Sequence, residues 1–110
     1  GHMIDWARVT ELREEIGDED FSEVVELFLE EVDAVIATLA PGMADLEAQL
    51  HFLKGSALNL GFDAFSTLCQ DGESAAASGG GAGVDIPRIL TVYAASRAEF
   101  SAGLNTRLAG

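Results

Sequence analysis

The spacing of the apolar residues is the feature that most restricts what this chain can fold into. Between residues 21 and 39 apolar side chains recur at third and fourth positions, and acidic residues fall mostly between them. This period predicts an amphipathic helix that ends before Pro41. Asp18 or Asp20 is expected to cap its start. Its apolar face comprises Phe21, Val24, Val25, Phe28, Val32, Val35, Ile36 and Leu39.

The same period predicts a shorter helix before this segment and another helix after it. The shorter one spans residues 4–16, and Gly17 stops it. The later one runs to Leu60, and Gly61 ends or bends it. Its apolar steps alternate between three and four residues without a break, as in the seam of a helical bundle. The seam residues are Met43, Leu46, Leu50, Leu53, Ala57 and Leu60.

Two more helices are predicted in the last part of the chain. The first has Phe62, Phe65, Leu68 and Cys69 inward and fades into residues 75–77. Residues 78–84 are rich in glycine and predict a flexible loop. Asp85 then caps the last helix, and Pro87 lies at its start. The inward face of that helix is expected to hold Ile86, Ile89, Leu90, Tyr93, Phe100, Leu104 and Leu108.

These elements together predict an all-α fold, because no segment alternates with the period of two that strands show. Short connections between long helices favour an antiparallel up-down four-helix bundle with a short extra N-terminal helix. Residues 1–3 resemble an expression-tag remnant, and residues 4–110 are expected to form one domain. Met3 as the natural start and Gly110 as the end favour a free-standing protein, in which His51 is the one native histidine.

Charge and composition exclude several classes of partner. The chain has 6 basic and 19 acidic residues, and the resulting net charge of −13 repels nucleic acids and anionic membranes. Apolar runs are too short to span a bilayer. A lone Cys69 and the lack of a leader predict a cytoplasmic protein, most simply a monomer. Eleven of the acidic residues lie between Glu11 and Asp33, either as a solvated face or as an edge that steers a basic partner.

The sequence also argues against most catalytic chemistry. The glycine-rich stretch is followed by no Gly-Lys-Ser/Thr, so it does not predict a nucleotide site. One native histidine and one cysteine, 18 positions apart, offer no cluster of metal ligands. Cys69 is better explained as a small core residue than as a nucleophile. We therefore expect no enzyme activity of the chain's own and no bound cofactor.

One helical stripe carries residues that core packing does not require. His51, Lys54, Gly55 and Leu58 share a stripe beside the apolar seam, so the histidine is expected to face outward. Lys54, the only lysine, lies within reach of a group attached to the imidazole. Gly55 costs a helix interior about 1 kcal/mol relative to alanine. Taken alone, each of these three residues has a purely structural explanation: a surface histidine, a solvated lysine and a glycine at a close helix crossing.

Covalent phosphate carriage gives these residues a common purpose. An unperturbed imidazole has a pKa of about 6.5, so a neutral ring nitrogen is available as a nucleophile near pH 7. The phosphoramidate it forms is labile enough to pass the group onward. Lys54 would neutralise the added charge, and Gly55 would leave room for a partner's active site.

The run from His51 to Gly61, HFLKGSALNLG, resembles the His-x-x-Lys-Gly-Ser/Ala-small-x-x-apolar-Gly signature of histidine-containing phosphotransfer (HPt) domains. The acidic Phe-Leu-Glu-Glu run at residues 28–31 and the Leu-Cys pair at residues 68 and 69 agree with it. The likeness extends from Ile4 to Leu108. It implies a four-helix bundle without kinase machinery, whose exposed histidine takes a phosphoryl group from one receiver-domain aspartate and passes it to another.

By position, the resemblance makes His51 the phosphoacceptor, Lys54 the phosphate-neutralising cation and Gly55 the residue that gives clearance. Ser56 and Ala57 would be small residues that permit close helix packing. The sequence departs from the family pattern in two places, both of which concern packing. The segment 40–45 is shorter than usual, and Gly72 replaces a typical apolar residue.

The partners implied are response-regulator receiver domains and a hybrid or sensor histidine kinase, with Mg²⁺ bound by the receiver. We expect docking through an apolar patch of Leu58, Phe52 and Phe62, although a core position for Phe62 is equally compatible with the pattern. One alternative is a helical adaptor that binds receiver or kinase domains without being phosphorylated. Another is the phosphoacceptor module of a chemotaxis-type kinase, which would continue far beyond the C-terminus.

Overall fold

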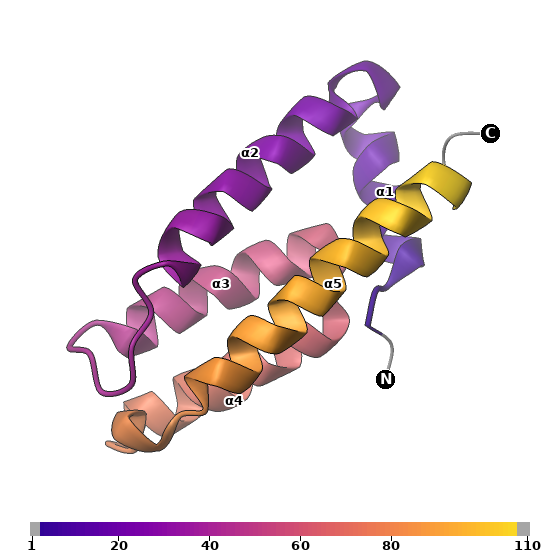
Figure 1. Ribbon diagram of the computed structural model, residues 1–110. Helices are drawn as coiled ribbons and strands as arrows, with labels where there is room; N and C mark the ends of the chain where they lie inside the picture. The colour runs from indigo at the N-terminus through magenta and orange to yellow at the C-terminus, as the bar shows by residue number, and fades with distance from the viewer. Residues whose placement is uncertain (1–2, 108–110) are drawn as a thin grey trace.

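The computed structural model describes residues 3–107, and these residues form an all-helical fold, as predicted. Consecutive long helices reverse direction along the molecule (Figure 1). Residues 1, 2 and 108–110, and with them the predicted inward position of Leu108, lie outside the described part. The helices are α1 (Trp6–Ile16), α2 (Asp18–Ile36), α3 (Leu46–Leu60), α4 (Asp63–Ala77) and α5 (Ile86–Arg107), and a 3-10 turn, η1 (Gly81–Gly83), precedes α5.

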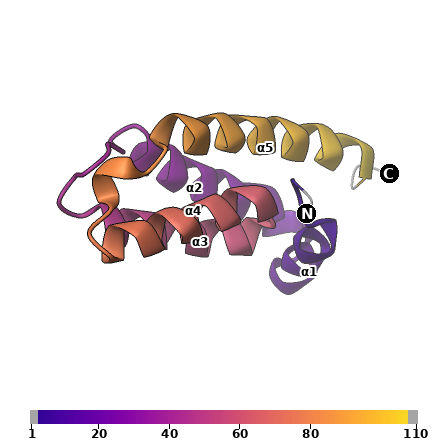
Figure 2. The ribbon, with the colours of Figure 1, turned by 90° about the horizontal axis from the view of Figure 1, so that it is seen from below.

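The helices α3 and α4 form a hairpin that two residues connect. Gly61 ends α3 with a φ of 77°, a left-handed conformation that glycine adopts without strain. A Cβ atom at this position would lie 2.7 Å from the carbonyl oxygen of Asp5, so a side chain does not fit. Figure 2 shows the two helices side by side, with α5 running along the pair. The tight junction sets which residues of α3 face which residues of α4.

The first two helices meet at a single residue, Gly17, which has a φ of 96°. The prediction that Gly17 stops the first helix is confirmed. The prediction that Asp18 or Asp20 caps α2 is wrong, because both residues lie inside its first turn and Gly17 is the capping residue. Their carboxylates instead lie at the positive end of the helix dipole.

The N-terminal segment pairs with the hairpin and does not extend α1. Ile4 forms an isolated antiparallel bridge with Phe62, and the backbone N–H of Asp5 donates to the carbonyl of Gly61 at 2.7 Å. The helix α1 consequently begins at Trp6, two residues later than predicted. The Asp5 side chain caps it by accepting from the backbone N–H of Arg8 at 3.3 Å.

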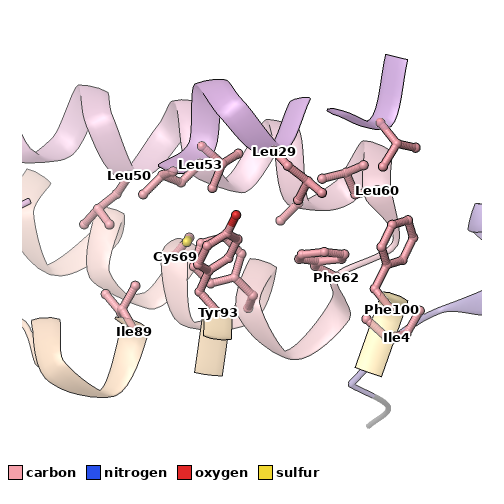
Figure 3. Close-up of a cluster of buried hydrophobic side chains, with 14 of the residues drawn as sticks. Ile4, Leu29, Leu50, Leu53, Leu60, Phe62, Cys69, Ile89, Tyr93 and Phe100 are labelled. Carbon is pink, nitrogen blue, oxygen red and sulfur yellow. The ribbon is translucent and has the colours of Figure 1, made fainter. Parts of the chain in front are cut away.

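The core lies between the helices, and Phe62 belongs to it, beside Phe100 (Figure 3). Phe62 is 1% exposed, and its ring lies 5.2 Å from that of Phe100 and 6.2 Å from that of Tyr93. Its predicted place in a surface docking patch is therefore wrong. The bridge to Ile4 and the turn at Gly61 fix the backbone so that this ring points inward.

The apolar seam of α3 is confirmed for its helical part. Five of the six seam residues are buried, whereas Met43 lies before the helix and is half-buried. In α4, Phe65 and Cys69 are buried as predicted, and Leu68 is half-buried. The buried seam residues are Leu46, Leu50, Leu53, Ala57 and Leu60.

Polar contacts attach α5 at its start and at its middle. The Asp85 carboxylate accepts from the backbone N–H of Arg88 at 3.1 Å, which confirms the predicted cap. Further along, the Tyr93 hydroxyl donates to Asp33 of α2 at 2.7 Å, and Arg97 forms an ion pair with the same carboxylate. Asp33 thus connects α2 to α5 across the bundle.

The acid-rich segment of α1 and α2 is mostly exposed, and basic side chains pair with only some of it. Arg8 bridges Glu11 and Glu15, and Arg13 pairs with Asp18. A role of this segment in steering a partner stays a prediction. None of the helices in the described chain is both long and apolar enough to cross a membrane.

Candidate functional site

The stripe predicted to face outward on α3 is at the surface. The His51 side chain is 68% exposed, whereas its neighbours Leu50 and Leu53 are fully buried. Gly55 and Leu58 are exposed too, and Lys54 is 20% exposed. The outward position of His51 is therefore confirmed, and the buried seam on the other side of α3 explains it.

Glu73 of α4 contacts both His51 and Lys54 of this stripe. Its Oε2 atom lies 2.9 Å from Nδ1 of His51, and its Oε1 atom lies 2.8 Å from Nζ of Lys54. The lysine also donates a hydrogen bond of 3.0 Å to Oε1 of Gln70. The Gln70 amide in turn donates to the hydroxyl of Ser74 at 3.2 Å. Two helices thus hold the imidazole and the ammonium at one carboxylate.

The α3–α4 hairpin explains why these residues meet. In two antiparallel helices joined by a tight turn, residues equally far from the turn face each other. His51 and Glu73 are each eleven residues from Phe62, and Lys54 and Gln70 are each eight residues from it. Two residues that are three positions apart on α3 therefore lie opposite two residues that are three positions apart on α4.

The ionisation of Glu73 determines the role of each imidazole nitrogen by elimination. Lys54 first, and then His51, lower the pKa of the Glu73 carboxyl below its usual value. An ionised carboxylate only accepts hydrogen bonds, so Nδ1 of His51 must donate. A neutral ring with its proton on Nδ1 carries the lone pair on Nε2. Nε2 has no hydrogen-bond partner among the described residues, and the ring is open to solvent.

Gly55 lies one residue beyond Lys54 on an unobstructed surface. A Cβ atom added there would have no atom of the described chain within 4 Å, apart from its own helix backbone and chain neighbours. A close helix crossing, the simpler explanation of this glycine, is therefore wrong for the described part of the chain. The structure leaves space beside the imidazole that nothing in the described fold occupies.

Apolar and acidic surfaces both adjoin the ring. Leu58 is 55% exposed and Phe52 is 36% exposed, which agrees with their predicted place at the surface. A shallow depression lies beside His51 and Glu73. Its remaining lining consists of Ala44, Asp45, Glu47 and Ala48.

Metal and thiol chemistry find no support in this region. The described residues contain no group of three or more His, Cys, Asp or Glu side chains that could hold a metal ion. Cys69 is fully buried. Burial, with a smaller contribution from the negative Glu73, raises the pKa of its thiol to about 12. Cys69 is therefore a core residue, as predicted.

Glu73 and Gln70 were not predicted from the sequence. The signal that could have found them is their distance from the turn, which equals that of His51 and Lys54. Using it requires knowing that the junction is as short as Gly61 and Phe62. Because Gly61 was expected either to end or to bend the helix, the facing positions on α4 stayed undefined.

Comparison with models of known families matches residues 23–102 with the Hpt domain. The matched segment includes every residue of the cluster around His51. Searches of curated proteins and of solved structures give no significant match.

Proposed function

This chain belongs to the Hpt domain family, and we propose that it carries phosphate on His51 in a two-component phosphorelay. Hpt domains are phosphocarriers and not kinases, and they interact with receiver domains and histidine kinases. On this proposal His51 accepts the group from a receiver aspartate or a kinase. It then passes the group to another receiver aspartate.

The observation that carries the proposal is the state of the His51 ring. Nδ1 is held by an ionised carboxylate at 2.9 Å, while the exposed Nε2 has no partner in the described chain. An imidazole is oriented for nucleophilic attack when a carboxylate holds one ring nitrogen and the other ring nitrogen is unpaired. An ordinary surface histidine would need neither the carboxylate nor the neighbouring lysine.

The transfer step follows from this arrangement. The Nε2 lone pair attacks the phosphorus atom, a P–N bond forms, and the P–O bond to the donor aspartate breaks. The donor carboxylate leaves with the electron pair. The imidazole, which still carries the Nδ1 proton, gains positive charge, and Glu73 stabilises that charge at 2.9 Å. The return step reverses each of these changes.

Lys54 and Gly55 serve the transferred group in different ways. Lys54 is the only lysine, and its ammonium already lies at the Glu73 carboxylate that holds the ring. It supplies positive charge where a phosphoryl group brings about two negative charges. Gly55 gives clearance, because nothing of the described chain lies near its position. The metal chemistry of the transfer, through Mg²⁺, is assigned to the receiver.

Docking is assigned to the apolar surface near the ring. Leu58 and Phe52 are exposed large hydrophobic residues on the helix that carries His51. A partner that covers these side chains removes their apolar surface from water, which favours binding. We place the protein in the cytoplasm as a monomer, and its buried free thiol is compatible with a reducing compartment.

The test is phosphoryl transfer from a labelled receiver domain to the parent protein and to the His51→Gln variant. His2→Gln is the matched control, because His2 is the only other histidine. We expect label on the parent and on the control, stable to base and labile to acid, and none on His51→Gln. Label on His51→Gln at the parental level would refute the site. Binding to receivers without any labelling of the parent would favour the adaptor.

A further inference from the structure

Lys54 is already engaged before any phosphate arrives. Its Nζ atom lies 2.8 Å from Oε1 of Glu73, in a carboxylate whose side chain is only 17% exposed. This Oε1 atom is itself buried and receives no well-aligned hydrogen bond. The ammonium is therefore the group that compensates its charge. Moving Lys54 toward another anion would leave a buried carboxylate oxygen uncompensated, which is unfavourable.

We propose that Glu73 shortens the lifetime of the phosphoryl group on His51, so that the site is built to release phosphate quickly and not to store it. This inference rests on the proposed function and adds a role for a residue outside the motif. Glu73 is a positioning residue, since it acts through the imidazole and through Lys54. Two independent consequences of its contacts lead to the same result.

The first consequence is competition for positive charge. The neutral imidazole, Lys54 and Glu73 together have no net charge. A phosphoryl group brings about two negative charges, and the positive charge that the ring gains offsets only part of them. The phosphoryl group must share Lys54 with Glu73. No other basic residue of the described chain forms an ion pair with this cluster. The phosphorylated state is consequently less stable than it would be beside an uncommitted lysine.

The second consequence concerns the leaving group. When the P–N bond breaks, its electron pair goes to Nε2. A ring that keeps its Nδ1 proton leaves as neutral imidazole, whereas a ring without this proton would leave as an imidazolate, a much poorer leaving group. The ionised Glu73 accepts from Nδ1 at 2.9 Å and thus favours the protonated ring. It keeps phosphohistidine in its reactive form up to a higher pH.

The other charged groups near the ring do not make this contact. Asp45, Glu47 and Glu73 line the depression beside His51, and Lys54 and Gln70 lie one turn along the hairpin. Among the described residues only Glu73 contacts an imidazole nitrogen. Asp45 and Glu47 are exposed, so water and salt screen their charges.

The experiment compares how fast phosphohistidine decays in the parent and in Glu73→Gln. Glutamine keeps an amide oxygen that can accept from Nδ1, but it carries no charge. Both full-length proteins are phosphorylated with potassium phosphoramidate, which transfers its phosphoryl group to Nε2 with loss of ammonia. The donor is removed, and ³¹P NMR follows decay from pH 6 to pH 10. In the decay, water attacks phosphorus, Nε2 takes the electron pair and inorganic phosphate is released.

We expect decay roughly tenfold slower in Glu73→Gln near pH 8, because Lys54 is then free to pair with the phosphoryl group and the charge that holds a proton on Nδ1 is gone. We also expect parental decay to persist to higher pH than decay of the variant. Glu47→Gln removes a nearby carboxylate that does not contact the ring, and its decay should stay within about twofold of the parent. Circular dichroism checks that all three proteins fold alike.

The outcomes separate the inference from the proposed function. Equal decay in the parent and Glu73→Gln, with an unchanged pH profile, would overturn the inference and leave phosphate carriage intact. Equal slowing in Glu47→Gln would also overturn it, since general charge would then explain the effect. If the correctly folded parent accepts no phosphoryl group, the proposed function fails, and the inference fails with it.

Discussion

The Cδ1 atom of Leu50 would lie 2.9 Å from a Cβ atom at Gly72, so the missing side chain at residue 72 lets α3 and α4 approach each other. A Cγ atom of Val84 would lie at 3.3 Å from the same point. The next residues along the two helices are His51 and Glu73, whose contact depends on this approach. The departure from the family pattern at Gly72 is therefore a packing feature that supports the site.

We predict that Gly72→Val destabilises the fold by about 1–3 kcal/mol, the usual range for overpacking a core. It should also weaken the contact between His51 and Glu73, because the two helices must move apart. Urea unfolding measures the loss of stability. The rate at which phosphoramidate phosphorylates His51 reports the change in its contact with Glu73. Unchanged stability would show that the ends of Leu50 and Val84 move aside without cost.

Gly55 differs from Gly72 because its surroundings are empty. Replacement by alanine removes the cost of a glycine in a helix, so we predict that Gly55→Ala stabilises the protein by about 0.5–1 kcal/mol. Gly55→Gln should fold equally well and yet transfer phosphate poorly to and from a receiver, since its side chain occupies the clearance. Transfer by Gly55→Gln at the parental rate would mean that no partner approaches here.

The hydroxyl of Tyr93 joins α5 to α2 through Asp33. We predict that Tyr93→Phe lowers the free energy of unfolding by about 1 kcal/mol at pH 7. Burial, followed by the hydrogen bond to Asp33, raises the pKa of Tyr93 above its usual value. Thermal melts of the parent and of Tyr93→Phe provide the measurement.

The sign of the pH effect follows from that shift. A group whose pKa is higher in the folded state contributes stability that is present below its unfolded pKa, about 10 for tyrosine, and that is lost as the pH rises toward the folded value. The parent should therefore lose stability between pH 10 and pH 11 more steeply than Tyr93→Phe. Parallel curves for the two proteins would argue against a buried, hydrogen-bonded hydroxyl.

Cys69 should resist modification in the native protein. Its pKa of about 12 leaves almost no thiolate at pH 8, and the side chain is fully buried. We predict that iodoacetamide labels native Cys69 at least about 100-fold more slowly than it labels the chain in urea. Mass spectrometry of timed samples gives both rates. Comparable rates would place this thiol at the surface.

The sequence predicted the helices well because their apolar period is strong and their ends carry glycine or a capping aspartate. The outward direction of His51 followed from the buried seam at Leu50 and Leu53. Phe62 was ambiguous, since a residue directly after a turn can face either way. Its position is decided by the bridge to Ile4, a contact between residues far apart in the chain that no local period encodes.

Only the part of the site that lies on α3 could be predicted from the sequence, for a related reason. His51, Lys54 and Gly55 lie on one helix, where spacing alone places them on one stripe. Glu73 lies on another helix, and its position opposite His51 depends on the length of the α3–α4 junction and on the close packing at Gly72. Local patterns specify one helix face, whereas the facing partner requires the register between two helices.

The last prediction concerns the apolar surface beside His51. Leu58 is 55% exposed on α3, so replacing it should cost the core little. We predict that Leu58→Asp weakens binding to a cognate receiver by about 1 kcal/mol or more, because it removes an apolar contact and places a charge that must lose its water on docking. Calorimetric titration measures the affinity, and a thermal melt checks the fold.

Leu27→Asp is the matched control, because Leu27 is 53% exposed and lies on a different helix, α2. Both variants add the same charge to an exposed leucine position, so a general electrostatic effect would weaken binding equally in the two. A larger loss for Leu58→Asp would locate docking beside His51. Equal losses would assign the effect to net charge, and a loss confined to Leu27→Asp would move the docking surface to α2.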